Sequence, residues 1–232
     1  MRQRARRPAG GSSVGTFRGC TLAIVLCLTL AAGGCGGGND EGSEGNPPAS
    51  GQSFSADHLK RFLLKSSDLP SGYEEAERNS GSGEDFVKAG ETREEERAAL
   101  ERVAAPGLEG FSSVTYKKEE GENRNRPGLV ALLYRTRSGA SKALPAVRGL
   151  FADNFRVTGA VDGPSQRKIR ASGLGDQSLA GLRMSLGPYG FFVYVWRDRN
   201  VVAALGASDI LGDMSGESIL RVAKRIDFRA TR

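Results

Sequence analysis

Apolar residues recur at the spacing of one helical face in four stretches of the chain. The first begins at Ser55, a favourable N-cap residue, and places Leu59 and Phe62 on one side until Pro70 interrupts the pattern. The second covers 91–103 and has acidic residues in its first turn. Because its apolar stripe is narrow, we expect this helix to lie on the surface.

The other two helices are predicted in the second half of the chain. One runs from about 141 to 155, and we prefer Ser141 to Ser138 as its N-cap. The reason is Pro145, which is tolerated in the first turn of a helix and costly deeper inside it. The last helix follows Ser215, and its inner side is formed by Ile219, Leu220, Val222, Ala223 and Ile226.

Elsewhere the apolar period changes to two, which is typical of strands. The predicted strands are 111–119, 129–134, 165–172, 182–186 and the two arms of a hairpin over 189–207. A polar loop at 119–128 joins the first two strands, and the last hairpin turns at 197–200. The strand over 165–172 is polar enough for the edge of a sheet.

A hairpin followed by a helix therefore occurs twice, at 111–155 and at 189–227. Strands in hairpins that are joined by helices favour an antiparallel β-sheet with helices packed on it. The sequence thus predicts an α+β fold, with a single globular domain over residues 55–232.

The first 34 residues have the layout of a secretory signal. Arginines precede the apolar run from Thr21 to Gly34, which is shorter than the ~20 residues that cross a membrane. The end of this segment, "LAAGGC", resembles the bacterial lipobox, although Ala32 stands where lipoboxes usually have leucine. The resemblance implies that residues 1–34 are removed and that Cys35 carries lipid such as palmitate. An uncleaved N-terminal anchor and full release are the alternatives.

Residues 35–54 then form a linker in this interpretation, because "GGGNDEGSEGNPPASGQS" lacks apolar periodicity and is rich in Gly, Ser, Pro and acids. The remaining cysteines, Cys20 and Cys27, belong to the leader. No disulfide is therefore expected in the mature chain, despite an extracytoplasmic location at the cell membrane.

The net charge of +6 does not indicate a nucleic-acid partner, because 5 of the 33 basic residues precede the apolar run and the remaining 28 nearly balance 27 acids. The charge is nevertheless uneven. Residues 36–123 carry 10 basic and 19 acidic side chains, and residues 124–232 carry 18 and 8. Either the two halves pack together, or a basic face binds an anionic envelope polymer or lipid headgroup. The candidate face comprises Lys168, Arg170, Arg183 and Arg197.

The sequence offers no recognisable catalytic constellation, cofactor motif or metal site. Its single histidine, His58, adjoins Asp57 in a predicted first turn, where the two side chains point in different directions. The acids Glu74 and Glu75 stand in a solvated charge run with nothing apolar nearby to raise a pKa. There is no G-x-S-x-G elbow, P-loop or dinucleotide fingerprint.

The most motif-like stretch is "GLGDQSLAG", residues 173–181, in which Asp176 and Ser178 could bind a ligand or fix the register of strands. It resembles the GD-x-S turn of exported actinobacterial lipoproteins, which include domains similar to the extracellular sensors of serine/threonine kinases. The resemblance covers about 165–228 and implies an extracytoplasmic α+β domain.

Aromatic side chains give a further clue, because Phe192, Tyr194 and Trp196 share one side of a strand. That side packs under a helix or lines a cleft for a glycan or lipid. Together the patterns favour a lipid-anchored module of the cell envelope that binds a ligand, lipid, polymer or protein partner. An envelope hydrolase with serine or carboxylate chemistry is the alternative. The candidate binding residues are Asp176, Ser178, Tyr194, Trp196, Lys168 and Arg170.

Overall fold

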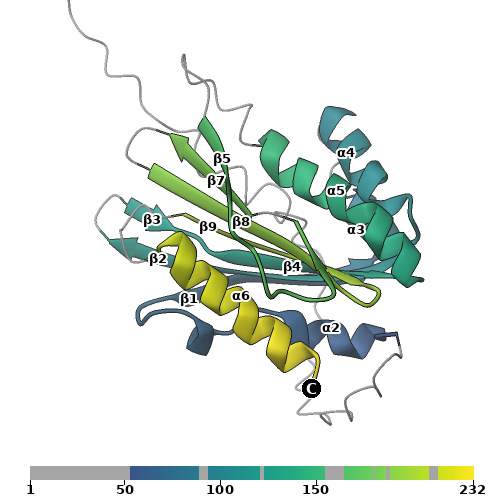
Figure 1. Ribbon diagram of the computed structural model, residues 1–232, viewed down its shortest axis with the longest axis horizontal. Helices are drawn as coiled ribbons and strands as arrows, with labels where there is room; N and C mark the ends of the chain where they lie inside the picture. Colours follow the sequence, from purple (N-terminus) through teal and green to yellow (C-terminus); the bar gives the residue numbers. More distant parts are fainter. Residues whose placement is uncertain are drawn as a thin grey trace, which may run out of the picture.

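A computed structural model describes residues 53–88, 94–120, 123–154, 165–179, 181–186, 189–208 and 214–232. Its centre is an antiparallel sheet with strand order β1-β2-β4-β9-β8-β7-β5, with β3 paired to β2 and β6 paired to β8. Helices α3, α4 and α5 cover one face of the sheet, and α2 and α6 cover the other (Figure 1). The predicted α+β class is therefore confirmed.

The strands are β1 (Glu74–Ser82), β2 (Leu108–Glu120), β3 (Asn123–Asn125), β4 (Gly128–Tyr134), β5 (Ser165–Ile169), β6 (Gln177–Ser178), β7 (Gly181–Leu186), β8 (Tyr189–Asp198) and β9 (Val201–Ser208). The helices are α2 (Ala56–Phe62), the 3-10 turn η1 (Ser66–Asp68), α3 (Gly83–Lys88), α4 (Glu94–Ala104), α5 (Arg137–Asn154) and α6 (Gly216–Ala230). No helix in the described ranges has the length and apolar character needed to cross a bilayer.

The two hairpin-and-helix units are present where the sequence predicts them. Strands β2 and β4 pair and are followed by α5, and β8 and β9 pair and are followed by α6. The polar strand β5 lies at an edge of the sheet, as expected. Ser55 and Ser215 precede α2 and α6 as N-caps, and Ser215 Oγ accepts a hydrogen bond from the Ser218 N–H at 3.2 Å.

Side chains along the central strands alternate strictly between the two faces of the sheet and so form two separate cores. On β8, Phe192, Tyr194 and Trp196 face α6, and the intervening Phe191 and Val193 face α5. The core beneath α6 also receives Ile219, Val222, Ala223 and Ile226, all of which are buried. Because both faces of β8 and β9 are covered, the sequences of these strands are almost continuously apolar.

Two edge features differ from the prediction. Glu74 and Glu75 are exposed, as expected of a solvated charge run, but they begin a strand that the sequence did not predict, β1, which pairs with β2. Its side chains alternate only between exposed and half-buried, so backbone pairing specifies this strand without an apolar period. Part of the polar loop predicted at 119–128 is also paired, because β2 continues to Glu120 and β3 aligns with it.

The predicted start of α5 at Ser141 is wrong. The helix begins at Arg137, and Thr136 Oγ1 accepts the N–H of Gly139 at 3.0 Å. Pro145 therefore lies in the helix interior, where it removes one backbone hydrogen bond. The buried side chains of this helix, which include Ala140, Leu144 and Val147, offset that loss by packing on the sheet.

Helix α4 is less superficial than its narrow stripe suggested, because Leu100 and Val103 are fully buried in the core beneath α5. Its outer side carries an i,i+4 ion pair between Arg97 Nε and Glu101 Oε1, at 3.0 Å.

Polar contacts tie the ends of the domain to its centre. The amide of Asn200 donates to the carbonyls of Phe54 and Tyr134 at 3.1 and 2.8 Å, and its Oδ1 accepts the Phe54 N–H at 2.7 Å. Near the C-terminus of α6, Arg229 donates to both carboxylate oxygens of buried Asp68, at 3.0 and 3.1 Å.

Candidate functional site

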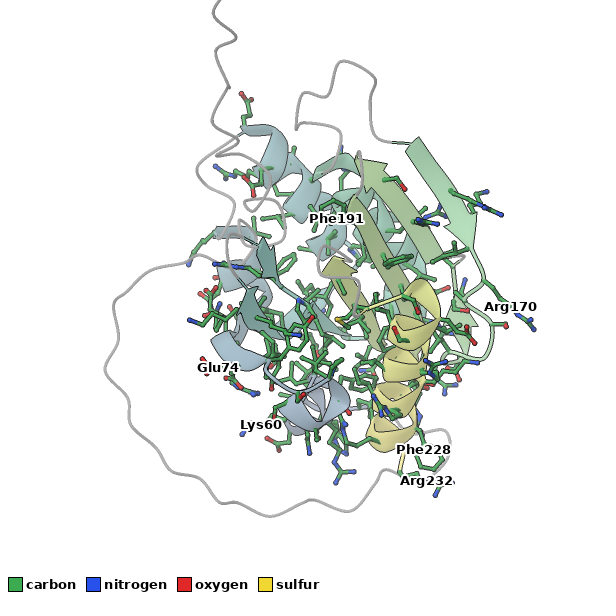
Figure 2. The ribbon with its side chains drawn as sticks, turned by 90° about the vertical axis from the view of Figure 1, so that its left-hand side faces the viewer. Lys60, Glu74, Arg170, Phe191, Phe228 and Arg232 are labelled. Carbon is green, nitrogen blue, oxygen red and sulfur yellow. The ribbon has the colours of Figure 1, made fainter. Side chains whose placement is uncertain are left out.

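A groove of about 560 Å³ lies between the N-terminal half of α6 and the sheet strands β5, β7 and β8. It is lined by Ile169, Arg170, Ser172, Arg183, Phe192, Tyr194, Gly216, Glu217, Leu220 and Lys224. Its volume falls within the range of small-molecule sites, roughly 300–1,000 Å³. Arg170, just beyond the end of β5, extends outward at the edge of the sheet (Figure 2).

The floor of the groove follows from the alternation of β8, which directs Phe192 and Tyr194 toward α6. The Tyr194 hydroxyl donates to the carbonyl of Gly216 at 2.7 Å and so fixes the start of the helix above the sheet. Burial raises the pKa of Tyr194 to about 12, which keeps this donor protonated at neutral pH. A Cβ at Gly216 would lie 2.8 Å from the Phe192 ring, so glycine allows α6 to begin this close to the sheet.

The rim of the groove is predominantly cationic. Arg170, Arg183 and Lys224 are exposed, and within the described ranges none of them forms an ion pair. Arg170 Nε donates to Ser172 Oγ at 2.8 Å, and the Arg183 guanidinium lies 5.7 Å from the Phe192 ring centroid. The lining carboxylate, Glu217, is 3.6 Å from Arg221 on the same helix.

The apolar part of the lining comes from both layers. Ile169 at the end of β5 and Leu220 on α6 are half-buried and pack against the core that contains Phe192 and Tyr194. The groove thus combines anion-binding side chains with a small apolar surface, an arrangement that suits an anionic ligand with an apolar portion.

The structure brings only some of the predicted site residues together. Tyr194 and Arg170 line the groove. Lys168 is exposed on β5 outside the lining, and Trp196 is fully buried in the core. Asp176 directly precedes the short strand β6 and Ser178 ends it, and Ser178 Oγ donates to the carbonyl of Ala171 at 3.0 Å.

The predicted basic face is divided in a similar way, since Arg183 is in the groove and Arg197 is not. The lining residues that the sequence did not single out as site residues include Glu217, Leu220 and Lys224 of α6. Their spacing of three and four places them on one helical face, and this signal was available in the sequence.

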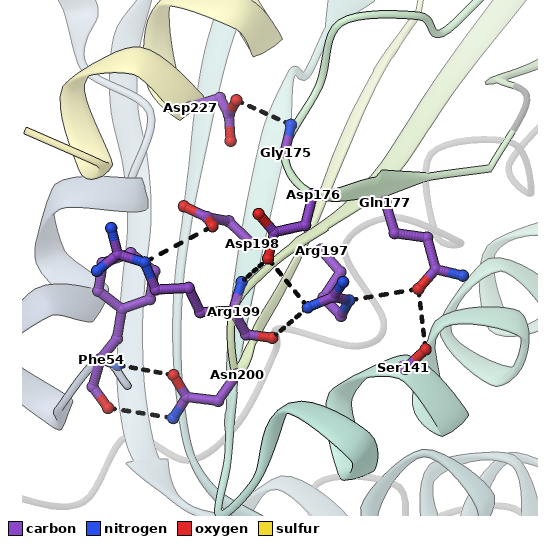
Figure 3. Close-up of polar contacts among 10 residues, drawn as sticks. All are labelled: Phe54, Ser141, Gly175, Asp176, Gln177, Arg197, Asp198, Arg199, Asn200 and Asp227. Carbon is purple, nitrogen blue, oxygen red and sulfur yellow. Dashed lines mark hydrogen bonds and ion pairs between the residues drawn. The ribbon is translucent and has the colours of Figure 1, made fainter. Parts of the chain in front are cut away.

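Arg197 and Asp176 instead belong to a polar cluster around the β8–β9 turn (Figure 3). Asp176 Oδ2 accepts hydrogen bonds from the Arg199 N–H at 2.9 Å and from Arg197 Nη1 at 3.2 Å. Arg197 Nη1 also donates to the Arg199 carbonyl at 2.7 Å. These bonds stabilise the turn, where Arg199 has a φ of 51°, in the left-handed region.

The same cluster holds one buried and one half-buried carboxylate, those of Asp198 and Asp227. Asp198 is 4% exposed, and its Oδ2 has no hydrogen-bond partner among the described residues. Burial, with the nearby charges of Asp176 and Asp227, raises the pKa of Asp198 to about 6. Burial also raises the pKa of Asp227, although its Oδ2 accepts the Gly175 N–H at 2.9 Å.

No catalytic or metal-binding arrangement emerges from the described ranges. His58 contacts Ser55, with 2.8 Å between His58 Nδ1 and Ser55 Oγ, in the first turn of α2. Groups of His, Cys, Asp and Glu that could hold a metal ion are absent from this part of the chain. The lipidation predicted at Cys35 lies outside the described residues.

The architecture places the chain in the class of α+β domains with an antiparallel sheet covered by helices on both faces. No protein-family model matches the sequence, and no curated protein is significantly similar to it. Among solved structures, the chain is similar to the extracellular domain of PknH from Mycobacterium tuberculosis, with a TM-score of 0.51 and 14% sequence identity. The match covers 77% of this chain and 97% of that one.

At this level of identity the likeness shows a shared fold. The shared fold is that of an extracellular domain, and the match spans more of the chain than the stretch 165–228 on which the sequence resemblance depends.

Proposed function

We propose that this chain is an extracytoplasmic binding module, held at a membrane through lipid on Cys35, whose groove under α6 binds an anionic small molecule with an apolar part. The observation that carries the proposal is the groove itself, with three cations on its rim and apolar side chains on its floor. The fold shared with an extracellular domain and the signal-like leader support the location.

The charge balance of the lining favours an anion. Arg170, Arg183 and Lys224 face one carboxylate, Glu217, whose charge is partly balanced by Arg221. Guanidinium groups bind phosphate and carboxylate through two parallel hydrogen bonds, and the lysine adds a mobile point charge. A ligand with one anionic group would therefore be bound at the rim.

The apolar floor favours a ligand that is more than a simple anion. Ile169 and Leu220 are half-buried beside the cations. A purely hydrophilic ligand would leave their apolar surface exposed to water. We therefore expect the groove to prefer an organic anion over inorganic phosphate.

Native mass spectrometry of the full chain purified from membranes tests this function. The wild-type protein should carry a small molecule that dissociates on denaturation. Ser172→Trp, which fills the groove from an exposed position, should lose it. Lys142→Trp on the opposite face of the sheet should retain it, because Lys142 is exposed on α5. Equal occupancy in both variants, or none in the wild type together with no binding of added organic anions, would refute the proposal.

A further inference from the structure

One end of the molecule combines exposed cations with an exposed aromatic ring. Phe228, near the C-terminus of α6, is 54% exposed and is the large apolar side chain most open to water in the described ranges. The guanidinium of Arg232 lies 3.6 Å from its ring centroid. Both views place α2 and the C-terminal end of α6 at the same end of the molecule, and Figure 2 labels Lys60, Phe228 and Arg232 there.

Contacts between the two helices confirm that these residues form one surface. Arg229 donates to the carbonyls of Arg61 and Leu63 at 3.3 and 2.7 Å, so the end of α6 abuts the end of α2. Arg225 Nη2 donates to the Asp68 carbonyl at 2.6 Å, which places α6 beside η1. We call this surface the basic end and define it by Lys60, Lys65, Arg225, Phe228 and Arg232, which are all exposed.

The acids that α2, η1 and the last turns of α6 contribute are fewer than the cations of the same segments. Asp68 is already bound by Arg229, with distances of 3.0 and 3.1 Å. Asp57, in the first turn of α2, is the other acid carried by α2 and η1, and Asp227 on α6 turns inward to the Gly175 N–H. Cations therefore dominate the surface that surrounds Phe228.

We propose that the basic end is a docking surface for an anionic lipid bilayer, with Phe228 inserted among the headgroups and the surrounding cations on lipid phosphates. An aromatic ring flanked by arginine and lysine suits the membrane–water interface, where the ring is partly dehydrated and the cations remain hydrated. Each cation near an anionic bilayer contributes on the order of a five-fold gain in partitioning.

The start of the ordered chain supports this occupant. Phe54 packs on Phe62 of α2, with ring centroids 5.3 Å apart, so the linker that follows Cys35 joins the domain beside the basic end. A lipid on Cys35 would hold this end near the bilayer and raise its effective concentration there. The docking surface does not depend on ligand binding in the groove, and it can be tested separately.

Site-specific tryptophan fluorescence of the full chain on vesicles tests the orientation. The native Trp196 is fully buried and serves as an internal reference. The fluorescence emission of the tryptophan introduced by Phe228→Trp should shift to shorter wavelength on vesicles that contain phosphatidylglycerol. Brominated lipid in these vesicles should quench it. Lys142→Trp, on the opposite side of the sheet, should show neither change even when an anchor binds both variants to the vesicle.

A second arm tests the charges. In the Phe228→Trp background, Lys60→Glu with Arg232→Glu should raise the vesicle concentration that gives half-maximal quenching at least ten-fold. Arg137→Glu with Lys142→Glu should leave that concentration unchanged. Equal quenching at positions 228 and 142 would overturn the proposed orientation. Equal quenching of position 228 by neutral phosphatidylcholine vesicles would overturn the role of anionic lipid, and its absence on anionic vesicles would overturn the docking surface.

Discussion

Replacing Asp198 with asparagine should stabilise the protein at neutral pH, because the wild-type carboxylate is ionised there in a buried position. Asp198 is 4% exposed, its Oδ2 lacks a partner among the described residues, and the nearest cation, Arg199, is 4.0 Å from its Oδ1. Burial therefore disfavours the charged form, and the charges of Asp176 and Asp227 disfavour it further.

The magnitude follows from the pKa of Asp198, which rises from 3.8 to about 6 on folding. Because the folded state holds this proton more tightly, its stabilising contribution is complete below pH 3.8 and is lost as pH rises through 6. At ~1.4 kcal/mol for each pH unit, the loss is about 3 kcal/mol. The asparagine side chain does not titrate, so the variant does not undergo this loss.

Urea unfolding of both proteins between pH 4 and pH 7.5, followed by the fluorescence of buried Trp196, measures the difference. The free energy of unfolding of Asp198→Asn relative to wild type should rise by about 2.5 kcal/mol from the lowest to the highest pH, because the rest of the ~3 kcal/mol is lost below pH 4. Asp85→Asn is the control of opposite sign, because hydrogen bonds from the Ser82 hydroxyl and N–H lower the pKa of Asp85. A flat or falling difference for Asp198→Asn would refute the reasoning.

Three other substitutions test separate parts of the account. Arg229→Ala should lower the free energy of unfolding by roughly 2–3 kcal/mol in urea titrations, since it leaves buried Asp68 without its cation; Arg221→Ala, whose pair with Glu217 is exposed, should cost under ~1 kcal/mol. Gly175→Ala should lower the free energy of unfolding by ~2 kcal/mol or more, and with it the thermal midpoint, because φ is +52° and a Cβ would meet the Arg197 carbonyl. Gly149→Ala should not lower the midpoint, because there is open space around Gly149 on α5. Cys35→Ser should abolish acylation and leave the chain outside the membrane fraction or with its leader attached, as intact-mass spectrometry would show; an unchanged lipid adduct would disprove the assignment of Cys35.

The elements that the sequence predicts well are those whose side chains are sorted by burial. The alternation of Phe192, Tyr194 and Trp196 on β8 and the helical spacing of Ile219, Val222 and Ile226 on α6 both report the core directly. Strand β1 was missed because its side chains are exposed or half-buried, so its place depends on backbone pairing with β2. The start of α5 was misplaced because the packing of its buried face outweighs the hydrogen bond that Pro145 removes.

The groove was harder to predict than its individual residues. Arg183 and Lys224 lie far apart in sequence, and they share a rim only because β7 pairs with β8 and α6 lies across that part of the sheet. The motif at 173–181 drew attention to Asp176, whose carboxylate is occupied by the β8–β9 turn. A motif thus identified a structural turn, and the neighbouring strands and helix formed the candidate site.

Isothermal titration of the full chain with dodecyl phosphate, below its micelle concentration, is the most direct test that the α6 groove binds an anionic ligand with an apolar part. We expect saturable one-to-one binding to the wild type, at least ten-fold weaker in Arg170→Ala with Arg183→Ala and unchanged in Arg137→Ala with Lys142→Ala. Inorganic phosphate and the neutral detergent dodecyl maltoside should each bind far more weakly. Equal affinity of the two double variants, or no preference for dodecyl phosphate over these two probes, would contradict the account.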